Sequence, residues 1–361
     1  MSFSFGKNFR ISIFGQSHSK EIGVVIDGLK AGYRINYSLI KENLMRRRPG
    51  KNSISSPRKE NDEFEIVSGE VDGISCEAPL CIKIKNKDQK SSDYDNIIDR
   101  PRPSHADYPA FIKYNSHNDI RGGGSFSGRM TAPLVIAGSI AEDILREKNI
   151  RIFSRIKSIK DIEDKKLEYK DLELESLEYL KKKDFPVIDD DAGDEMIKLI
   201  EEYREKKDSL GGLVEVFVLG MPVGVGEPFF DSLESVIAKG VFSIPSVKGL
   251  EFGEGFNSAK MTGSTHNDPY IVKNGRVITK TNHHGGIIGG LSTSMPIYYT
   301  VAIKPTSSIG IIQDTISLKN LSNEKLLIEG RHDPCIVPRA LVAIEMISAI
   351  CILDLLMEFE K

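Results

Sequence analysis

Residues 121–129 read RGGGSFSGR and run directly into a predicted helix that begins near Thr131. Three consecutive glycines let backbone amides approach a ligand closely. The helix N-terminus adds free N–H donors and the positive end of a helix dipole. Two arginines and two serines complete a cradle for an oxyanion or a phosphate. A flexible loop with incidental arginines would explain the stretch alone equally well, and it lacks the Gly-x-x-x-x-Gly-Lys-Ser/Thr pattern of a P-loop.

Helices are predicted directly after this stretch and well before it. The following helix has Pro133 in its first turn and an apolar stripe at helical spacing. The stripe consists of Leu134, Ala137, Ile140, Ala141 and Ile144. The earlier helix starts near Tyr37, is capped by Asn36 and ends at Pro49-Gly50. Its last turn therefore carries three consecutive arginines, Arg46, Arg47 and Arg48.

Alternating apolar residues predict strands in the remaining regular segments. These segments are residues 9–14, 79–84, 211–228 and 297–304. Turn residues separate the first two strands, at Gly69, Asp72 and Gly73. The strands and helices together predict an α+β fold. Because the chain shows neither an internal repeat nor a low-complexity linker, we expect one domain over residues 1–361.

Two long segments differ sharply in polarity. Residues 157–207 are rich in Lys, Asp and Glu, which predicts surface helices and loops in contact with solvent. Residues 340–359 form the most apolar stretch, interrupted by Glu345 and Asp354. A membrane span tolerates few charges, so this stretch is predicted as an amphipathic helix packed on the core.

Composition excludes several classes of protein. The formal net charge is -3, whereas a general nucleic-acid-binding protein is usually strongly basic. Four scattered cysteines without a Cys-x-x-Cys pair indicate reduced thiols instead of disulfides or a zinc site. Residues 1–20 contain no apolar run of signal-peptide length. We therefore expect a cytoplasmic protein that binds neither nucleic acid nor membrane.

Histidines occur in turns beside functional residue types. His18 follows the first strand, and His105 lies in Arg-Pro-Ser-His-Ala-Asp at residues 102–107. Imidazole titrates near neutral pH, so either residue could deliver a proton to a departing phosphate or to a cofactor. A lone histidine beside a turn is more often structural. The nearby arginines favour the functional interpretation, because anion binding and proton delivery occur together.

A metal site is the weaker interpretation of the later histidines. His283, His284, His332 and Asp333 are ligand types. Adjacent histidines point in different directions, and no His-Glu-x-x-His spacing is present. We therefore predict no metal.

Taken together, these segments resemble the chorismate synthase family. Eight motifs of that family occur here in the same order and cover nearly the whole chain. They are residues 15–18, 46–50, 86–94, 102–107, 121–129, 282–287, 304–308 and 330–335. The resemblance implies an α+β sandwich of helices around antiparallel sheets, usually assembled as a homotetramer. It also implies a lyase that converts 5-enolpyruvylshikimate 3-phosphate to chorismate and phosphate by 1,4-anti elimination, in the shikimate pathway of aromatic amino acid biosynthesis.

The family further implies reduced FMN, although the reaction has no net redox change. NADPH is a second cofactor if the protein reduces its own flavin, and otherwise an external flavin reductase is a partner. By position, His18 matches the histidine that protonates the leaving phosphate. His105 matches the one that protonates or polarises the flavin, and Asp333 matches a carboxylate near the flavin's reactive nitrogen.

The resemblance also implies two sets of binding residues. The substrate set is Ser17, Arg47, Arg48, Arg102, Ser127, Arg129 and Arg331. The flavin set is Ser125, Phe126, Ser127, Pro245, Ser246, Gly289, Lys304, Pro305, Thr306, Ser307, Ser308 and Arg331.

The chain departs from the family pattern at several positions. Gln16 replaces a glutamate, Ser19 and Ser104 replace glycines, and Ser125-Phe126 stands in place of Arg-Ser. Further departures are Gly128 and Met130 in place of alanine and glutamate, and Ser53 in place of an arginine. Each lost charged hydrogen bond would weaken anion binding by roughly 1.5–3 kcal/mol. The altered loop at 125–130 keeps open a catalytically degenerate relative that binds FMN or a phosphometabolite. The region of His283, His284 and His332 keeps open a metal-dependent phosphatase.

Overall fold

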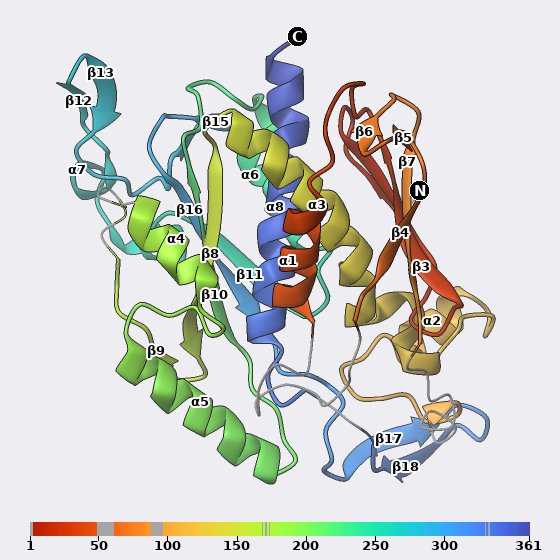
Figure 1. The fold of residues 1–361 in the computed structure, drawn as a ribbon. Helices are drawn as coiled ribbons and strands as arrows, with labels where there is room; N and C mark the ends of the chain where they lie inside the picture. The colour runs from red at the N-terminus through yellow and green to blue at the C-terminus, as the bar shows by residue number, and fades with distance from the viewer. Residues whose placement is uncertain are drawn as a thin grey trace.

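The structure is a computed structural model, which describes residues 3–48, 61–87, 97–167, 169, 172, 174–328, 330 and 333–361. Two five-stranded antiparallel sheets enclose a middle layer of helices (Figure 1). The first sheet has the order β1 (Ser4–Phe5), β2 (Arg10–Phe14), β3 (Glu21–Asp27), β7 (Leu80–Lys85) and β4 (Phe64–Ser68). The second has the order β11 (Val247–Phe252), β16 (Ile297–Ile303), β10 (Gly212–Leu219), β8 (Arg151–Ile159) and β9 (Ile162–Glu163).

Three helices form the middle layer, namely α1 (Tyr37–Arg47), α3 (Thr131–Glu147) and α8 (Val337–Phe359). Helix α3 contacts the first sheet and α8 contacts the second, and the two helices pack on each other. Gly138 of α3 lies against Met346 of α8, where a β-carbon would collide. The expected α+β class is confirmed, with these helices lying between the sheets and not only around them.

The remaining elements are short or peripheral. The helices are α2 (Asp107–Lys113), α4 (Leu174–Lys182), α5 (Asp190–Glu205), α6 (Leu233–Val241) and α7 (Gly263–His266). The hairpins are β5–β6 (Glu70–Val71, Ile74–Ser75), β12–β13 (Tyr270–Lys273, Arg276–Thr279), β14–β15 (Ile287–Ile288, Leu291–Ser292) and β17–β18 (Gln313–Ser317, Ser322–Leu326). A single hydrophobic cluster runs through the middle layer and the inner faces of both large sheets.

Most predicted local elements are confirmed, but the segment 211–228 forms a strand only over β10, Gly212–Leu219. Helix α1 starts at Tyr37, and the Asn36 side chain accepts a hydrogen bond from Leu39 N at 3.1 Å. Helix α3 starts at Thr131, although it is buried on more than the predicted stripe. In β7 the alternating residues Leu80, Ile82 and Ile84 are all buried. Pro49-Gly50 and Ser53 lie outside the described residues.

Helix α8 corrects the expectation of an amphipathic helix, because it is buried on nearly all sides. It is long and apolar enough to cross a membrane by length and composition, yet 94% of its most apolar window is buried inside the fold. The two charged residues that interrupt its apolar stretch, Glu345 and Asp354, have internal partners. The Asp354 carboxylate accepts hydrogen bonds from the backbone N–H groups of Lys7, Asn8 and Phe9 at 2.6–3.0 Å. Those bonds attach the N-terminal segment to the core.

The second charge on α8, Glu345, corrects part of the prediction for residues 157–207. Glu345 is fully buried and pairs with Arg46 at 2.9 Å. It also pairs with Lys181 of α4, which in turn pairs with Glu142 of α3. Lys181 is therefore an internal residue and not part of a solvated face. Residues 157–159 also belong to strand β8, which the charge-rich pattern did not reveal.

Candidate functional site

The glycine-rich stretch lies between the two predicted acids. Gly122, Gly123 and Gly124 all have positive φ angles, a backbone that other residues rarely adopt. A β-carbon on Gly122 would lie 2.6 Å from His18 Cδ2, and one on Gly123 would lie 3.3 Å from His105 Nε2. The stretch therefore touches both imidazoles, which come from turns far apart in sequence. Because its three glycines have no side chains, both imidazole rings can lie against this stretch.

His105 is held by a buried ion pair. Its Nδ1 lies 2.5 Å from Asp107 Oδ1, and Arg102 Nε donates to Asp107 Oδ2 at 2.7 Å. Burial alone would raise the pKa of the Asp107 carboxyl. Hydrogen bonds from Arg102 and His105 outweigh burial and hold that pKa well below its ordinary value. Because a carboxylate only accepts, His105 Nδ1 carries the proton and Nε2 faces Gly123.

Two arginines share one buried carboxylate. Arg47 Nη2 donates to Asp62 at 2.7 Å, and Arg129 Nη1 donates to the other oxygen of the same carboxylate. Burial opposes ionisation of Asp62, but the positive charges of Arg47 and Arg129 outweigh it and lower the pKa of Asp62. In this trio of Arg47, Asp62 and Arg129, one carboxylate binds two guanidinium groups. The Arg47 Nε–H is also buried and has no hydrogen-bond partner among the described residues.

Asp333 connects this trio to residues 304–308, which are predicted to bind flavin. Its side chain pairs with Arg339 at the start of α8, and its carbonyl accepts from Thr306 Oγ1 at 3.1 Å. Arg339 Nε also donates to the Arg47 carbonyl at 3.2 Å. Arg102 Nη1 donates to Ser308 Oγ at 3.3 Å. Residues 304–308 therefore contact both the part of the site around Asp333 and the part around Arg102 and His105.

Asn86 closes these contacts into a ring. Arg129 Nε donates to Asn86 Oδ1 at 3.1 Å, and Asn86 Nδ2 donates to the Ser19 carbonyl at 2.8 Å, beside His18. The ring surrounds the end of the middle layer where α1 stops and α3 and α8 begin, low in the view of Figure 1. Four arginines and three aspartates contribute to the ring, namely Arg47, Arg102, Arg129, Arg339, Asp62, Asp107 and Asp333. Two helix N-termini add positive dipole ends beside these residues.

The predicted flavin residues divide into two groups. Lys304 N donates to the Ser246 carbonyl at 2.9 Å, so residues 245–246 and 304–308 lie side by side. Burial and the nearby positive charge of Lys248 lower the pKa of Lys304. Among the described residues, Lys304 has no carboxylate partner, so a bound phosphate would stabilise its charged form. These residues fit a phosphorylated cofactor such as FMN.

Gly289 is not brought to this group. It lies in the β14–β15 hairpin, beyond the Ile297 end of β16, whereas Lys304 follows the Ile303 end. Seven residues of strand separate the two ends, roughly 20 Å. A ligand centred on residues 304–308 is therefore remote from Gly289 of the same copy.

Other predicted residues have local roles or lie at the margin. Arg48 caps α1 through its backbone N–H, which donates to the Leu44 carbonyl. Ser17 N donates to the Gly124 carbonyl at 3.2 Å, and Ser127 Oγ accepts from Arg129 N at 3.3 Å. Ser125 is half-buried, and Phe126 is exposed. Arg331 and His332 lie outside the described residues, as does most of the motif at 86–94.

The described ligand types of the metal interpretation, His283, His284 and Asp333, are divided between two places. His283 and His284 both direct Nδ1 at the Asp268 carboxylate, at 3.3 and 2.9 Å. Asp333 belongs to the ring at the other end of β16. Among the described residues, no group of three or more His, Cys, Asp or Glu is arranged to hold a metal ion.

Sequence reasoning missed Asp62 and Arg339 as site residues. Asp62 follows a stretch without a recognisable motif, and its φ of 50° is unusual for a residue other than glycine. Arg339 looks like an ordinary residue in the first turn of a helix. Asp107 was within a quoted motif, and its role becomes evident only from its contact with His105.

Comparison with known proteins shows the same family along the whole chain. The family described as Chorismate synthase matches residues 9–357. A chorismate synthase of Dehalococcoides mccartyi is 42% identical over 355 residues, which cover 98% of this chain and 96% of that protein. One of Pyrococcus abyssi is 43% identical over 351 residues, which cover 97% and 96%. A crystal structure of chorismate synthase superposes with a TM-score of 0.78 and 28% identity, covering 98% of this chain and 93% of that one.

Proposed function

The chain belongs to the chorismate synthase family of lyases, and from this premise we propose that it converts 5-enolpyruvylshikimate 3-phosphate to chorismate and phosphate in a reaction that requires reduced FMN. The observation that carries the proposal is the ring of contacts, in which two imidazoles adjoin four arginines. In the elimination, the C–O bond to phosphate breaks with its electron pair, and the substrate also loses one ring hydrogen. The protein must therefore bind an anion, hold it near a proton donor and keep water away.

His18 is proposed to protonate the leaving phosphate, which makes phosphate a better leaving group. Its side chain is buried next to Gly122, so its position depends on the glycine-rich stretch. The guanidinium groups of Arg47 and Arg129 are proposed to bind the anionic groups of the substrate, and the buried Arg47 Nε–H is a donor available for such a contact. Arg48 and Ser17 adjoin these residues and complete the proposed substrate site.

His105 is proposed to exchange a proton at Nε2 with the flavin, because Asp107 holds its Nδ1. Residues Ser246, Lys304, Thr306 and Ser308 would hold the flavin and its phosphate. When bound, the reduced flavin would lend electron density transiently while phosphate leaves. Asp333 is proposed to accept or donate a proton in the part of the site next to Thr306.

Anaerobic conversion of the substrate with chemically reduced FMN tests this proposal, by following chorismate absorbance and released phosphate together. His18→Ala and His105→Ala should each lower turnover by roughly 10²–10⁴-fold. His117→Ala is the matched control, because His117 is exposed and outside the ring. Flavin binding without any product would instead identify a degenerate relative. Full activity of both histidine variants would remove these residues from the mechanism.

The source of reducing equivalents requires a separate arm of that experiment. Replacing the chemical reductant with NADPH should support turnover if the protein reduces its own flavin. Failure with NADPH alone, together with activity after addition of a flavin reductase, would identify an external reductase as the partner.

We also propose a homotetramer in the cytoplasm. Phe229 and Phe230 are 87% and 91% exposed, and Phe229 has a φ of 65°, which is costly for a bulky residue. Such an aromatic pair supports burial against a second copy of the chain. The proposed cytoplasmic location is supported by four free thiols, which a reducing compartment would preserve, namely Cys76, Cys81, Cys335 and Cys351. Sedimentation should show four copies, and Phe230→Asp should give smaller species; an unchanged tetramer would exclude this surface from the interface.

A further inference from the structure

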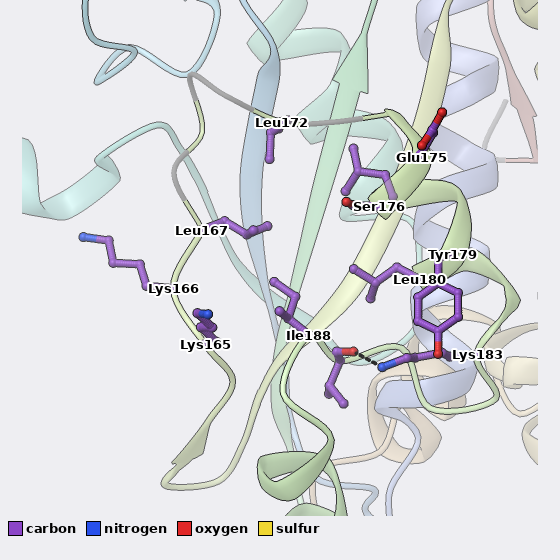
Figure 2. A pocket seen from close by; sticks show the side chains of 12 residues that line it. Lys165, Lys166, Leu167, Leu172, Glu175, Ser176, Tyr179, Leu180, Lys183 and Ile188 are labelled. Carbon is purple, nitrogen blue, oxygen red and sulfur yellow. Dashed lines mark hydrogen bonds between the residues drawn. The ribbon is translucent and has the colours of Figure 1, made fainter.

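A cavity of about 660 Å³ lies on the outer side of the second sheet, away from the ring of site residues. Helix α4 forms one wall, and residues 165–167 with Leu172 form the opposite one (Figure 2). Six aliphatic side chains line it, namely Leu167, Leu172, Leu177, Leu180, Val187 and Ile188. Its volume is in the range of pockets that hold small molecules, roughly 300–1,000 Å³. Walls of this kind favour an apolar ring or chain over a sugar or a nucleotide.

Ion pairs hold the α4 wall of this cavity in place. Lys181 of α4 turns inward and pairs with both Glu142 and Glu345 in the middle layer. Lys183 donates to the Val187 carbonyl at 2.9 Å and to Asp190 at 2.6 Å, which closes the loop after α4. Removing α4 from the sheet would leave buried charges unpaired, at a high energetic cost. The α4 wall of the cavity is therefore fixed to the rest of the fold.

Two lysines lie at the mouth of the cavity, on the wall opposite α4. Lys165 and Lys166 are exposed, and neither has a carboxylate partner among the described residues. The third lysine, Lys183, is neutralised by Asp190. Glu175 lies on α4 across the cavity from the two free lysines, so an anionic group would bind at the lysine side (Figure 2).

From this shape and charge, we propose that the cavity binds a small amphipathic carboxylate, with its apolar part between Leu167, Leu180 and Ile188 and its carboxylate beside Lys165 and Lys166. Apolar burial would supply most of the affinity, and the lysines would select an anion over a neutral or cationic molecule. The site is separate from the proposed active site, which lies at the junction of α1, α3 and α8.

Fluorescence titration of the full chain with anilinonaphthalene sulfonate tests the proposal, because this probe joins an apolar ring system to one anionic group. Binding should saturate at one probe per chain, decanoate should displace the probe, and saturating FMN should not. The double variant Lys165→Glu with Lys166→Glu should weaken binding about tenfold. Ser176→Trp should abolish it, because Ser176 lines the cavity at an exposed position where a large ring can enter without disturbing the core.

The matched control is Lys182→Glu, a charge reversal at an exposed position of α4 that does not line the cavity. It should bind the probe as the unaltered chain does. Displacement by FMN, or equal affinity in the Ser176→Trp variant and the control, would overturn the proposal. A complete lack of probe binding would also overturn the proposal. The cavity would then fit an apolar side chain of a protein partner instead of a small molecule.

Discussion

Gly122 is the position where one methyl group would test how the glycine-rich stretch holds His18. A β-carbon there would lie 2.5 Å from Ser17 Oγ and 2.6 Å from His18 Cδ2. Carbon atoms in contact rest about 3.5 Å apart, so the imidazole would have to retreat by about 1 Å. A displacement of about 1 Å in an active site lowers the rate about 10²-fold. The positive φ adds about 1–2 kcal/mol of destabilisation for alanine.

Gly128 provides the matched control in the same stretch. A β-carbon at Gly128 would meet no atom within 4 Å, and its φ is not positive. Gly128→Ala should therefore keep normal turnover and a similar or slightly higher stability. Gly122→Ala should lose about 10²-fold in turnover under anaerobic assay and about 1–2 kcal/mol in the free energy of unfolding by urea. Equal turnover of the two variants would refute the claim that the stretch positions His18.

Three further predictions concern residues around the site and in the core. Asp107→Asn should lower kcat by roughly 10²–10⁴-fold with little change in KM, because His105 loses the carboxylate that orients it; an unchanged kcat would contradict this. Ser104→Gly should raise the free energy of unfolding by about 1 kcal/mol, because Ser104 has a φ of 57°, and denaturant titration would detect it. Glu345→Gln should cost roughly 3–5 kcal/mol by leaving Arg46 without its charged partner, as measured by chemical denaturation. Burial opposes ionisation of Glu345, but Arg46 and its other partners lower the pKa of the Glu345 carboxyl to about 2. The stability that the ionised carboxylate contributes is therefore complete above pH 4.5 and is lost as pH falls toward about 2. The variant should lose less stability than the unaltered protein in that window, because other carboxylates still titrate there; equal acid sensitivity of both proteins would contradict the assignment.

Local patterns predicted the elements that present the site. Helix α1 and its Asn36 cap, the start of α3 at Thr131 and the alternation in β7 all depend on residues within a few positions of one another. The glycine-rich stretch was recognisable for the same reason, because its unusual backbone requires glycine at adjacent positions. Charge density was a poorer guide. It assigned Lys181 to the surface, although two buried carboxylates hold it inside.

By itself the sequence determined the family, the main helices and strands, and the residue types available for proton transfer and anion binding. Only the tertiary structure showed that Asp62 serves two arginines, that Arg339 connects Asp333 to Arg47, and that Gly289 lies apart. The physical reason is the range of the forces involved. Helix and strand patterns arise between neighbours in the chain, whereas the ring of the site joins element ends as much as 292 residues apart, and packing alone decides which charges meet there.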